Sequence, residues 1–177
     1  MQRKLTLLLV EAGCQPVPPV FAEEINLANF RLTDISYIQN FPQLKHVILW
    51  HNNLVSLDPL RCLKNLEKLW MGSCQIQFSQ DFSFLQNFPL LFDLEASSLW
   101  ISQTISISKS APNLVKLTLE NNNFDVFAAL IPLKKLEKLR FLSLKLNKIC
   151  SKLGYREKVQ GILGQILVLD DIGIDIM

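Results

Sequence analysis

Leucines and other large apolar residues recur along this chain in a spaced pattern that repeats about every 22 to 25 residues. The clearest copy covers residues 113–123 and reads Asn-Leu-Val-Lys-Leu-Thr-Leu-Glu-Asn-Asn-Asn. Leu117 and Leu119 alternate there with polar residues, which predicts a short strand with one buried face. Asn122 follows the strand. Because its side-chain amide both donates and accepts hydrogen bonds, we expect it to bond to backbone groups at the turn.

Six copies of this unit can be aligned, beginning at residues 22, 44, 66, 91, 114 and 139. Three of them have Pro two residues before the first Leu, which ends the preceding segment and leads into an extended strand. Two copies are irregular: Phe30 takes the Asn position in the first copy and Leu99 takes it in the fourth. The stretch from Leu99 to Ile107 is rich in Ile, Thr and Ser, and we expect it to be β-rich.

Units of about 20 to 29 residues with this apolar spacing are typical of leucine-rich repeats, which bury their leucines only by stacking on one another. The sequence therefore predicts an α/β solenoid, a leucine-rich repeat horseshoe. Its parallel sheet lines the concave side, and helical or irregular segments form the convex side. We expect a single domain over residues 1–177, with an N-terminal cap (1–21), six repeats (22–149) and a C-terminal cap (150–177).

Both ends have patterns of their own. The apolar run from Leu5 to Val10 follows basic residues, as in a signal peptide, but it is shorter than a normal signal hydrophobic region. The favoured interpretation is an amphipathic helix that ends at Gly13 and covers the open end of the solenoid; its apolar face would contain Leu5, Leu8, Leu9 and Ala12. At the other end we predict a helix followed by a half-repeat; the helix would bury Tyr155, Val159, Ile162 and Leu163.

The C-terminal part resembles the SDS-twenty-two-like class of leucine-rich repeat proteins, which close with a Tyr-Arg…Leu-x-x-Leu-Asp cap. Residues 132–139, Tyr155-Arg156-Glu157 and Val168-Leu169-Asp170 are similar to the leucine-rich domain of the acidic leucine-rich nuclear phosphoproteins. The A-prime protein of the U2 spliceosomal particle is similar at the same level. This closer likeness covers about residues 110–172. The family's long acidic tail, linked to histone binding and phosphatase inhibition, is not found in these 177 residues. The resemblance therefore implies a scaffold that binds protein.

Composition and charge modify this picture only slightly. Hydrophobic residues make up 49% and charged residues 19%, as in a folded protein rather than a disordered one. The net charge of +2 conceals a basic stretch from Lys134 to Lys158, where nine Lys or Arg face only Glu137 and Glu157. The favoured interpretation is a solvated surface. The alternative is a component of a ribonucleoprotein complex, or a direct RNA binder through this basic end, although no recognised RNA-binding motif is present.

Patterns typical of catalytic or metal-binding sites are scarce in this sequence. The cysteines Cys14, Cys62, Cys74 and Cys150 are widely spaced and have no zinc-ligand pattern, and Cys74 lies at a repeat position that is expected to be buried. Reduced thiols favour an intracellular location, cytoplasmic or nuclear. No segment reaches the ~20 apolar residues of a membrane span. The sequence therefore predicts no enzyme, no cofactor, no metal and no membrane partner, and it leaves the oligomeric state open.

The repeat register identifies the side chains on the exposed side of the strands. Trp50 and Trp70 lie on neighbouring strands, and we expect room around the Trp50 ring because its lateral neighbours are Ala28 and Gly72. Exposed aromatic clusters are enriched in binding hot spots. We predict that a protein partner binds the concave face through Trp50, Trp70, Ile48, His46, His51 and Lys68, with a secondary patch of Arg140, Phe141 and Lys145.

Two other interpretations of the tryptophan pair are open. The N-terminal segment or a second copy of the chain would cover the pair, or a register shift of one residue would bury it. A third tryptophan, Trp100, lies just past the fourth strand. We expect it to pack against the irregular fourth repeat.

Overall fold

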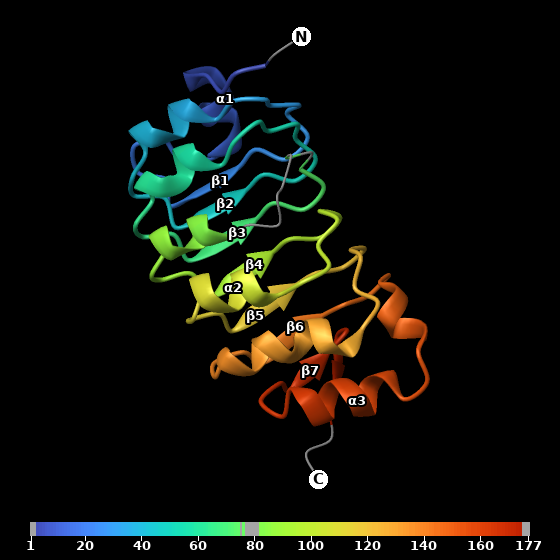
Figure 1. The fold of residues 1–177 in the computed structure, drawn as a ribbon. Coiled ribbons are helices and arrows are strands. Elements are labelled where there is room, and N and C mark those ends of the chain that lie inside the picture. The colour runs from blue at the N-terminus through green and yellow to red at the C-terminus, as the bar shows by residue number, and fades with distance from the viewer. Residues whose placement is uncertain (1–2, 75, 77–81, 175–177) are drawn as a thin grey trace.

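The computed structural model describes residues 3–74, 76 and 82–174. Its repeats stack in sequence order from the N-terminal end to the C-terminal end, with the strands side by side (Figure 1). The eight strands form one sheet in the order β1 to β8, parallel from β1 to β7 and antiparallel between β7 and β8. The strands are β1 (Glu24–Asn26), β2 (His46–Ile48), β3 (Lys68–Trp70), β4 (Asp93–Glu95), β5 (Lys116–Thr118), β6 (Phe141–Ser143), β7 (Val168–Leu169) and β8 (Ile172–Gly173).

The predicted register of the six repeats is confirmed. The middle residue of each repeat strand points into the core and is aligned with its equivalent on the next strand; these residues are Ile25, Val47, Leu69, Leu94, Leu117 and Leu142. All six are almost completely buried. The other side of the sheet is the concave face. A leucine-rich core shared by all repeats is the result, as expected for units that cannot bury their apolar residues alone.

Helical turns return the chain along the opposite side of the solenoid (Figure 1). They are η1 (Ser36–Asn40), η2 (Asp58–Cys62), η3 (Ser83–Asn87), α2 (Ile105–Ser110), η4 (Phe127–Lys135) and η5 (Lys148–Ser151). The expectation of a β-rich stretch over Leu99–Ile107 is wrong, because α2 begins within it. Ile107 is fully buried in α2, so core packing selects a helical turn at β-branched residues.

The expectation that Trp100 packs against the fourth repeat is also wrong, because 77% of its surface is exposed. Its neighbours Leu99 and Ile101 are both buried. With φ at +62°, the backbone turns the Trp100 side chain outward between these two anchors.

The Asn residues that recur after the strands bond to the backbone as predicted. Asn122 accepts from the backbone N–H of Leu99 and Ile101, both at 3.0 Å, and donates to the carbonyls of Ala96 and Leu119 at 2.9 and 3.0 Å. Asn52 and Asn147 make equivalent bonds to their own repeat and to the preceding one. These buried side-chain amides connect the turns of successive repeats, at the point where backbone hydrogen bonding between the strands has ended. Cys74 occupies the same position and donates through Sγ to the Leu49 carbonyl at 3.0 Å.

The N-terminal helix α1 (Leu7–Gly13) lies at the end of the sheet beside β1 (Figure 1). It ends at Gly13 as predicted. A Cβ at Gly13 would lie 2.8 Å from the Asn26 carbonyl oxygen, so the helix packs directly on β1. The predicted apolar face is right in part: Leu5 is buried and Leu9 is partly buried against the core. Leu8 is 73% exposed and Ala12 is exposed, whereas Val10, which was not predicted, is fully buried.

The C-terminal cap agrees with its prediction. Helix α3 (Tyr155–Ile162) buries Tyr155, Val159 and, just past its end, Leu163, while Ile162 is partly buried. The half-repeat that follows supplies β7, which pairs with β6. The Tyr155 hydroxyl donates to Asp170 Oδ2 at 2.8 Å, and Asp170 Oδ1 accepts from the Leu144 backbone N–H at 2.7 Å.

Candidate protein-binding face

Three aligned columns of side chains cover the exposed side of the sheet, as the register predicts. The first column is Glu24, His46, Lys68, Asp93, Lys116 and Phe141, and the second is Asn26, Ile48, Trp70, Glu95, Thr118 and Ser143. The third continues past the strand ends and contains Ala28, Trp50, Gly72, Ser97, Glu120 and Lys145. The predicted tryptophans therefore share one face of the sheet with Phe141 and Lys145 of the predicted secondary patch, whereas Arg140 is in none of the columns.

The tryptophan pair forms a fixed aromatic surface. The rings of Trp50 and Trp70 are stacked, with centroids 5.4 Å apart and an angle of 10° between their planes. Trp50 Nε1 donates to Glu95 Oε2 at 2.6 Å, and the same carboxylate accepts from the backbone N–H of Gly72 and Ser97 at 2.7 and 2.9 Å. Both tryptophans remain half-buried rather than covered. Among the described residues, neither the N-terminal segment nor a register shift hides them.

Gly72 is what allows this arrangement. A Cβ at this position would lie 2.6 Å from Glu95 Oε1 and 2.7 Å from Oε2, inside contact distance. The expectation of open space around the Trp50 ring is therefore wrong. Trp70 stacks on one side of that ring, and the Glu95 carboxylate occupies the place left by the missing side chain of Gly72.

Ile48, His46 and Lys68 lie beside the pair as predicted, and they line a small hollow together with Glu24 and Trp70. The hollow has a volume of about 50 Å³. Ile48 is only 9% exposed, so it forms part of the floor of the face rather than a projecting anchor. His46 is held between two carboxylates, with Nδ1 3.2 Å from Glu24 Oε2 and Nε2 3.8 Å from Glu67 Oε2.

His51 lies apart from this group. It follows the third column at the turn, where its φ of +56° directs the chain out of the strand, and its side chain is exposed. It is adjacent to the concave face but does not line the hollow beside Trp70.

The secondary patch contains a larger hollow, of about 320 Å³. Its lining residues come from β5, β6, β7 and the turn after β7: Lys116, Leu117, Thr118, Phe141, Leu142, Ser143, Val168 and Asp171. Phe141 is 43% exposed. Lys145 hydrogen-bonds to Asp171, which raises the pKa of the lysine, and it lies 3.9 Å from Glu120 Oε1. Arg140 turns away and donates to the backbone carbonyls of Glu137 and Leu139.

Glu95, Asp93 and Asp171 also contribute to this face, although the sequence pattern did not single them out. The repeat register does put Glu95 one strand from Gly72, and a carboxylate next to a glycine in an outward column is a usable signal. Asp171 gives no such signal, because its position depends on how β7 turns into β8.

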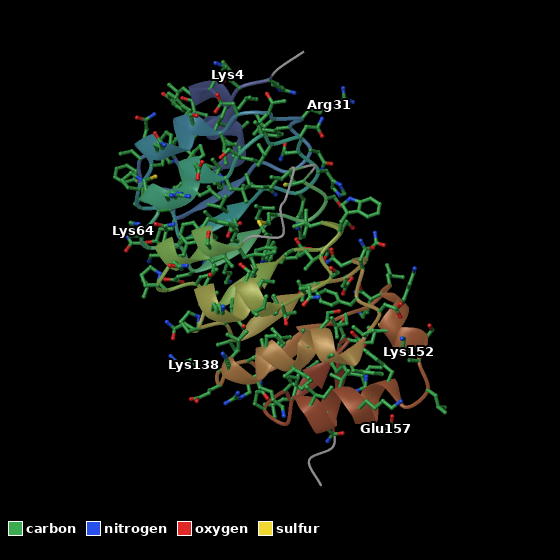
Figure 2. The ribbon with its side chains drawn as sticks, viewed as in Figure 1. Lys4, Arg31, Lys64, Lys138, Lys152 and Glu157 are labelled. Atoms are coloured by element: carbon green, nitrogen blue, oxygen red, sulfur yellow. The ribbon has the colours of Figure 1, made fainter. Side chains whose placement is uncertain are left out.

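The basic stretch from Lys134 to Lys158 is dispersed in the structure. Figure 2 shows Lys138 and Lys152 on opposite sides of the last repeats. Lys152 pairs with Asp125 at 2.8 Å, and Arg156 donates to the carbonyls of Leu169, Ile172 and Gly173. Several of these charges therefore stabilise the cap rather than forming a single cationic surface.

The described residues offer little reactive chemistry. Burial raises the pKa of the Cys74 thiol to about 12, and it also raises the pKa of Cys14, Cys62 and Cys150, which disfavours the nucleophilic thiolate. Within the part of the chain that the structure describes, no cluster of His, Cys, Asp or Glu has the composition of a metal site. In that same part, no helix has the length and apolar character needed to cross a membrane.

Comparison with family models gives two matches. Residues 42–87 match a model described as two copies of leucine-rich repeats, and residues 73–174 match a second model described as a leucine-rich repeat. The second match covers more than half of the 177 residues. It includes the secondary patch and most of the C-terminal cap.

Two curated relatives are similar over much of this chain. The probable U2 small nuclear ribonucleoprotein A' of Drosophila melanogaster is 26% identical over 168 residues, which is 94% of this chain and 54% of that protein. The cilia- and flagella-associated protein 410 of Mus musculus is 25% identical over 119 residues, covering 67% of this chain and 45% of that protein. The chain thus spans about half the length of the curated relatives it matches.

Solved structures share the fold. The crystal structure of the Drosophila melanogaster SNF/U2A' complex contains a chain that is 26% identical, with a TM-score of 0.53, over 98% of this chain and 87% of that one. An internalin C2 of Listeria monocytogenes has a TM-score of 0.62 at 20% identity, covering 88% of this chain and 65% of that one. A Leptospira interrogans leucine-rich repeat protein has a TM-score of 0.64 at 20% identity, covering 83% and 36%.

Proposed function

The chain belongs to the leucine-rich repeat family, and from that premise we propose that it is a non-catalytic binding module that holds a protein partner on its concave face. The observation that carries this proposal is the half-exposed Trp50–Trp70 stack, fixed by Glu95 on the central strands. A large aromatic surface that remains in contact with water is unfavourable in a free protein, and such surfaces mark binding sites.

The rigidity of the stack supports this role. Stacking and the Trp50–Glu95 hydrogen bond fix both rings before a partner arrives, so little side-chain entropy is lost on binding. Tryptophans of this kind are enriched among the residues that dominate interface energies. The neighbouring hollow beside Ile48 and Lys68 gives the surface a shape that a partner side chain can enter.

Membership in a ribonucleoprotein complex is a second candidate function. It is favoured by the similarity to the U2 small nuclear ribonucleoprotein A' and to a chain of the SNF/U2A' complex. In this proposal the chain joins such a particle in the nucleus through a protein partner, and the concave face again supplies the contact. Direct contact with RNA is not required.

Affinity capture from a native lysate tests the proposal. We expect Trp50→Ala with Trp70→Ala to lose the proteins that the unchanged chain retains, whereas Trp100→Ala retains them. Trp100 is a matched control because it is an exposed tryptophan outside the three columns. Thr118→Arg is a second test that adds bulk to the half-buried centre of the face without removing packing. Unchanged capture by both variants would contradict the proposal.

A further inference from the structure

A buried carboxylate on the concave face lacks a hydrogen-bond donor. Asp93 lies in the first column on β4 and is 6% exposed. Its Oδ1 atom has no hydrogen-bond partner among the described residues. Its Oδ2 atom has one neighbouring cation, Lys116 Nζ, at 4.0 Å, which is too long for a hydrogen bond. Buried carboxylates are normally paired, so an unpaired one requires an explanation.

The neighbours of Asp93 leave this carboxylate available. Lys68, on one side, directs its ammonium group toward the Phe92 ring, 5.8 Å from the centroid. Lys116, on the other side, has a side chain that is 50% exposed. Such a flexible, weakly bound lysine can turn toward solvent at little cost. That movement would uncover Asp93 from the side of the larger hollow, which Lys116 lines.

The chemistry of that hollow fits one kind of side chain. Phe141 and Val168 supply apolar and aromatic surface, and Thr118 and Ser143 supply hydroxyl groups. The charges in and beside it are Asp93, Glu120 and Asp171 against Lys116 and Lys145, a local excess of one negative charge. Lys145 is already bonded to Asp171, and the Ser143 hydroxyl donates to Glu120 Oε1 at 2.6 Å, which leaves Asp93 as the carboxylate without a donor.

We propose that this hollow accepts an arginine side chain of the protein partner. Its guanidinium would donate to Asp93 in place of the distant Lys116 contact, and its planar face would stack on the exposed ring of Phe141. Arginine suits this site better than lysine because its fork of N–H donors matches a carboxylate and its flat face packs on aromatic rings. The inference rests on the proposed function and specifies the partner chemistry at the secondary patch.

Selection of short random peptides displayed on phage tests this inference. We expect peptides retained by the unchanged chain to be enriched in Arg over Lys. With Asp93→Asn, which preserves size, we expect that preference to disappear and the selected peptides to bind about tenfold more weakly, as for the loss of a charge-assisted hydrogen bond. Asp58→Asn is the matched control, because it removes the same charge from an exposed residue of η2 on the convex side.

Thermal unfolding separates a binding role from a structural one. Because Asp93 has no donor in the free chain, we expect Asp93→Asn to leave the Tm unchanged or higher. A large fall in Tm would overturn the inference by showing that Asp93 stabilises the fold. Retention of peptides without Arg enrichment would also overturn it, although capture through the tryptophans would still stand. The same Arg preference in Asp93→Asn would overturn the role of this carboxylate.

Discussion

At the scale of single residues, the described structure depends on side chains that replace backbone partners. Asn122 makes this clear. Its amide satisfies two N–H groups and two carbonyls belonging to two successive repeats, and it is 7% exposed. Removing such a group leaves several buried backbone atoms unpaired, which costs more than the lost bonds alone. The sequence identified this role in advance, because Asn recurs at a fixed distance from the strand leucines.

Asn122→Ala is expected to lower the free energy of unfolding by about 3 kcal/mol, because it leaves unpaired donors in the core. Urea unfolding followed by circular dichroism measures the change. Asn123→Ala is the control: Asn123 is exposed and makes one long bond to the Trp100 carbonyl, so its loss should be within about 0.5 kcal/mol. Equal effects from the two variants would contradict the assigned role of Asn122.

A second residue-scale prediction concerns Gly72. Gly72→Ala places a Cβ against the Glu95 carboxylate, so either the carboxylate moves or the strands shift. We expect a loss of about 1–3 kcal/mol in unfolding free energy and an altered tryptophan fluorescence spectrum, since Trp50 loses its acceptor.

Gly161→Ala in α3 is expected to have the opposite effect and to raise the free energy of unfolding. Apart from its chain neighbours and the backbone of its own helix, no atom lies within 4 Å of the added Cβ, and helix propensity should add about 0.5–1 kcal/mol.

At the scale of elements, the sequence predicts the repeats well and the ends less well. Period-two alternation and the regular Leu spacing defined all six repeat strands, because each strand repeats the same burial pattern. The face of α1 was wrong at Leu8 and Ala12 for a local reason. Lys4 forms a bridge with Asp34, so Leu5 belongs to an extended segment and the helix starts at Leu7. The helical phase is therefore shifted, and Val10 replaces Leu8 in the core.

The fourth repeat shows a second limit on what the sequence pattern predicts. Its β-branched residues favour strands locally, yet the solenoid needs a return segment there, and α2 results. The columns that contain Trp50 and Trp70 could be predicted from the repeat register alone. The Glu95 contacts and the unpaired Asp93 did not, because they depend on side-chain directions that a sequence pattern does not contain.

The prediction at the scale of elements concerns the C-terminal cap. Tyr155 of α3 donates to Asp170, and that carboxylate also accepts from the last repeat at Leu144. We expect Tyr155→Phe to lower the free energy of unfolding by about 1.5–3 kcal/mol, as for a hydrogen bond to a charged group. Hydrogen exchange should show the earliest opening in β7 and α3. Tyr37→Phe, at an exposed position of η1, is the control and should leave exchange in the cap unchanged.

At the scale of the whole molecule, the distribution of charge favours protein over RNA as the proposed direct partner. The sequence suggested a basic end, but the fold divides that stretch between opposite sides of the solenoid (Figure 2). The basic residues of the concave face are interleaved with carboxylates, such as Lys145 with Asp171 and Lys116 with Asp93. A phosphate backbone approaching this face would therefore meet both signs of charge.

The salt dependence of RNA affinity measures how many phosphate contacts the chain makes. Each phosphate contact steepens the fall of log K with log salt by about 0.7 to 0.9 for nucleic acids. We expect fluorescence anisotropy with labelled single-stranded RNA to give a slope no steeper than about −2, arising from convex lysines such as Lys134 and Lys135. Lys134→Ala with Lys135→Ala should flatten that slope, whereas Lys145→Ala with Arg140→Ala should leave it unchanged, since both residues already have partners. A steep slope that the second pair flattens would instead make RNA a direct ligand of the concave face.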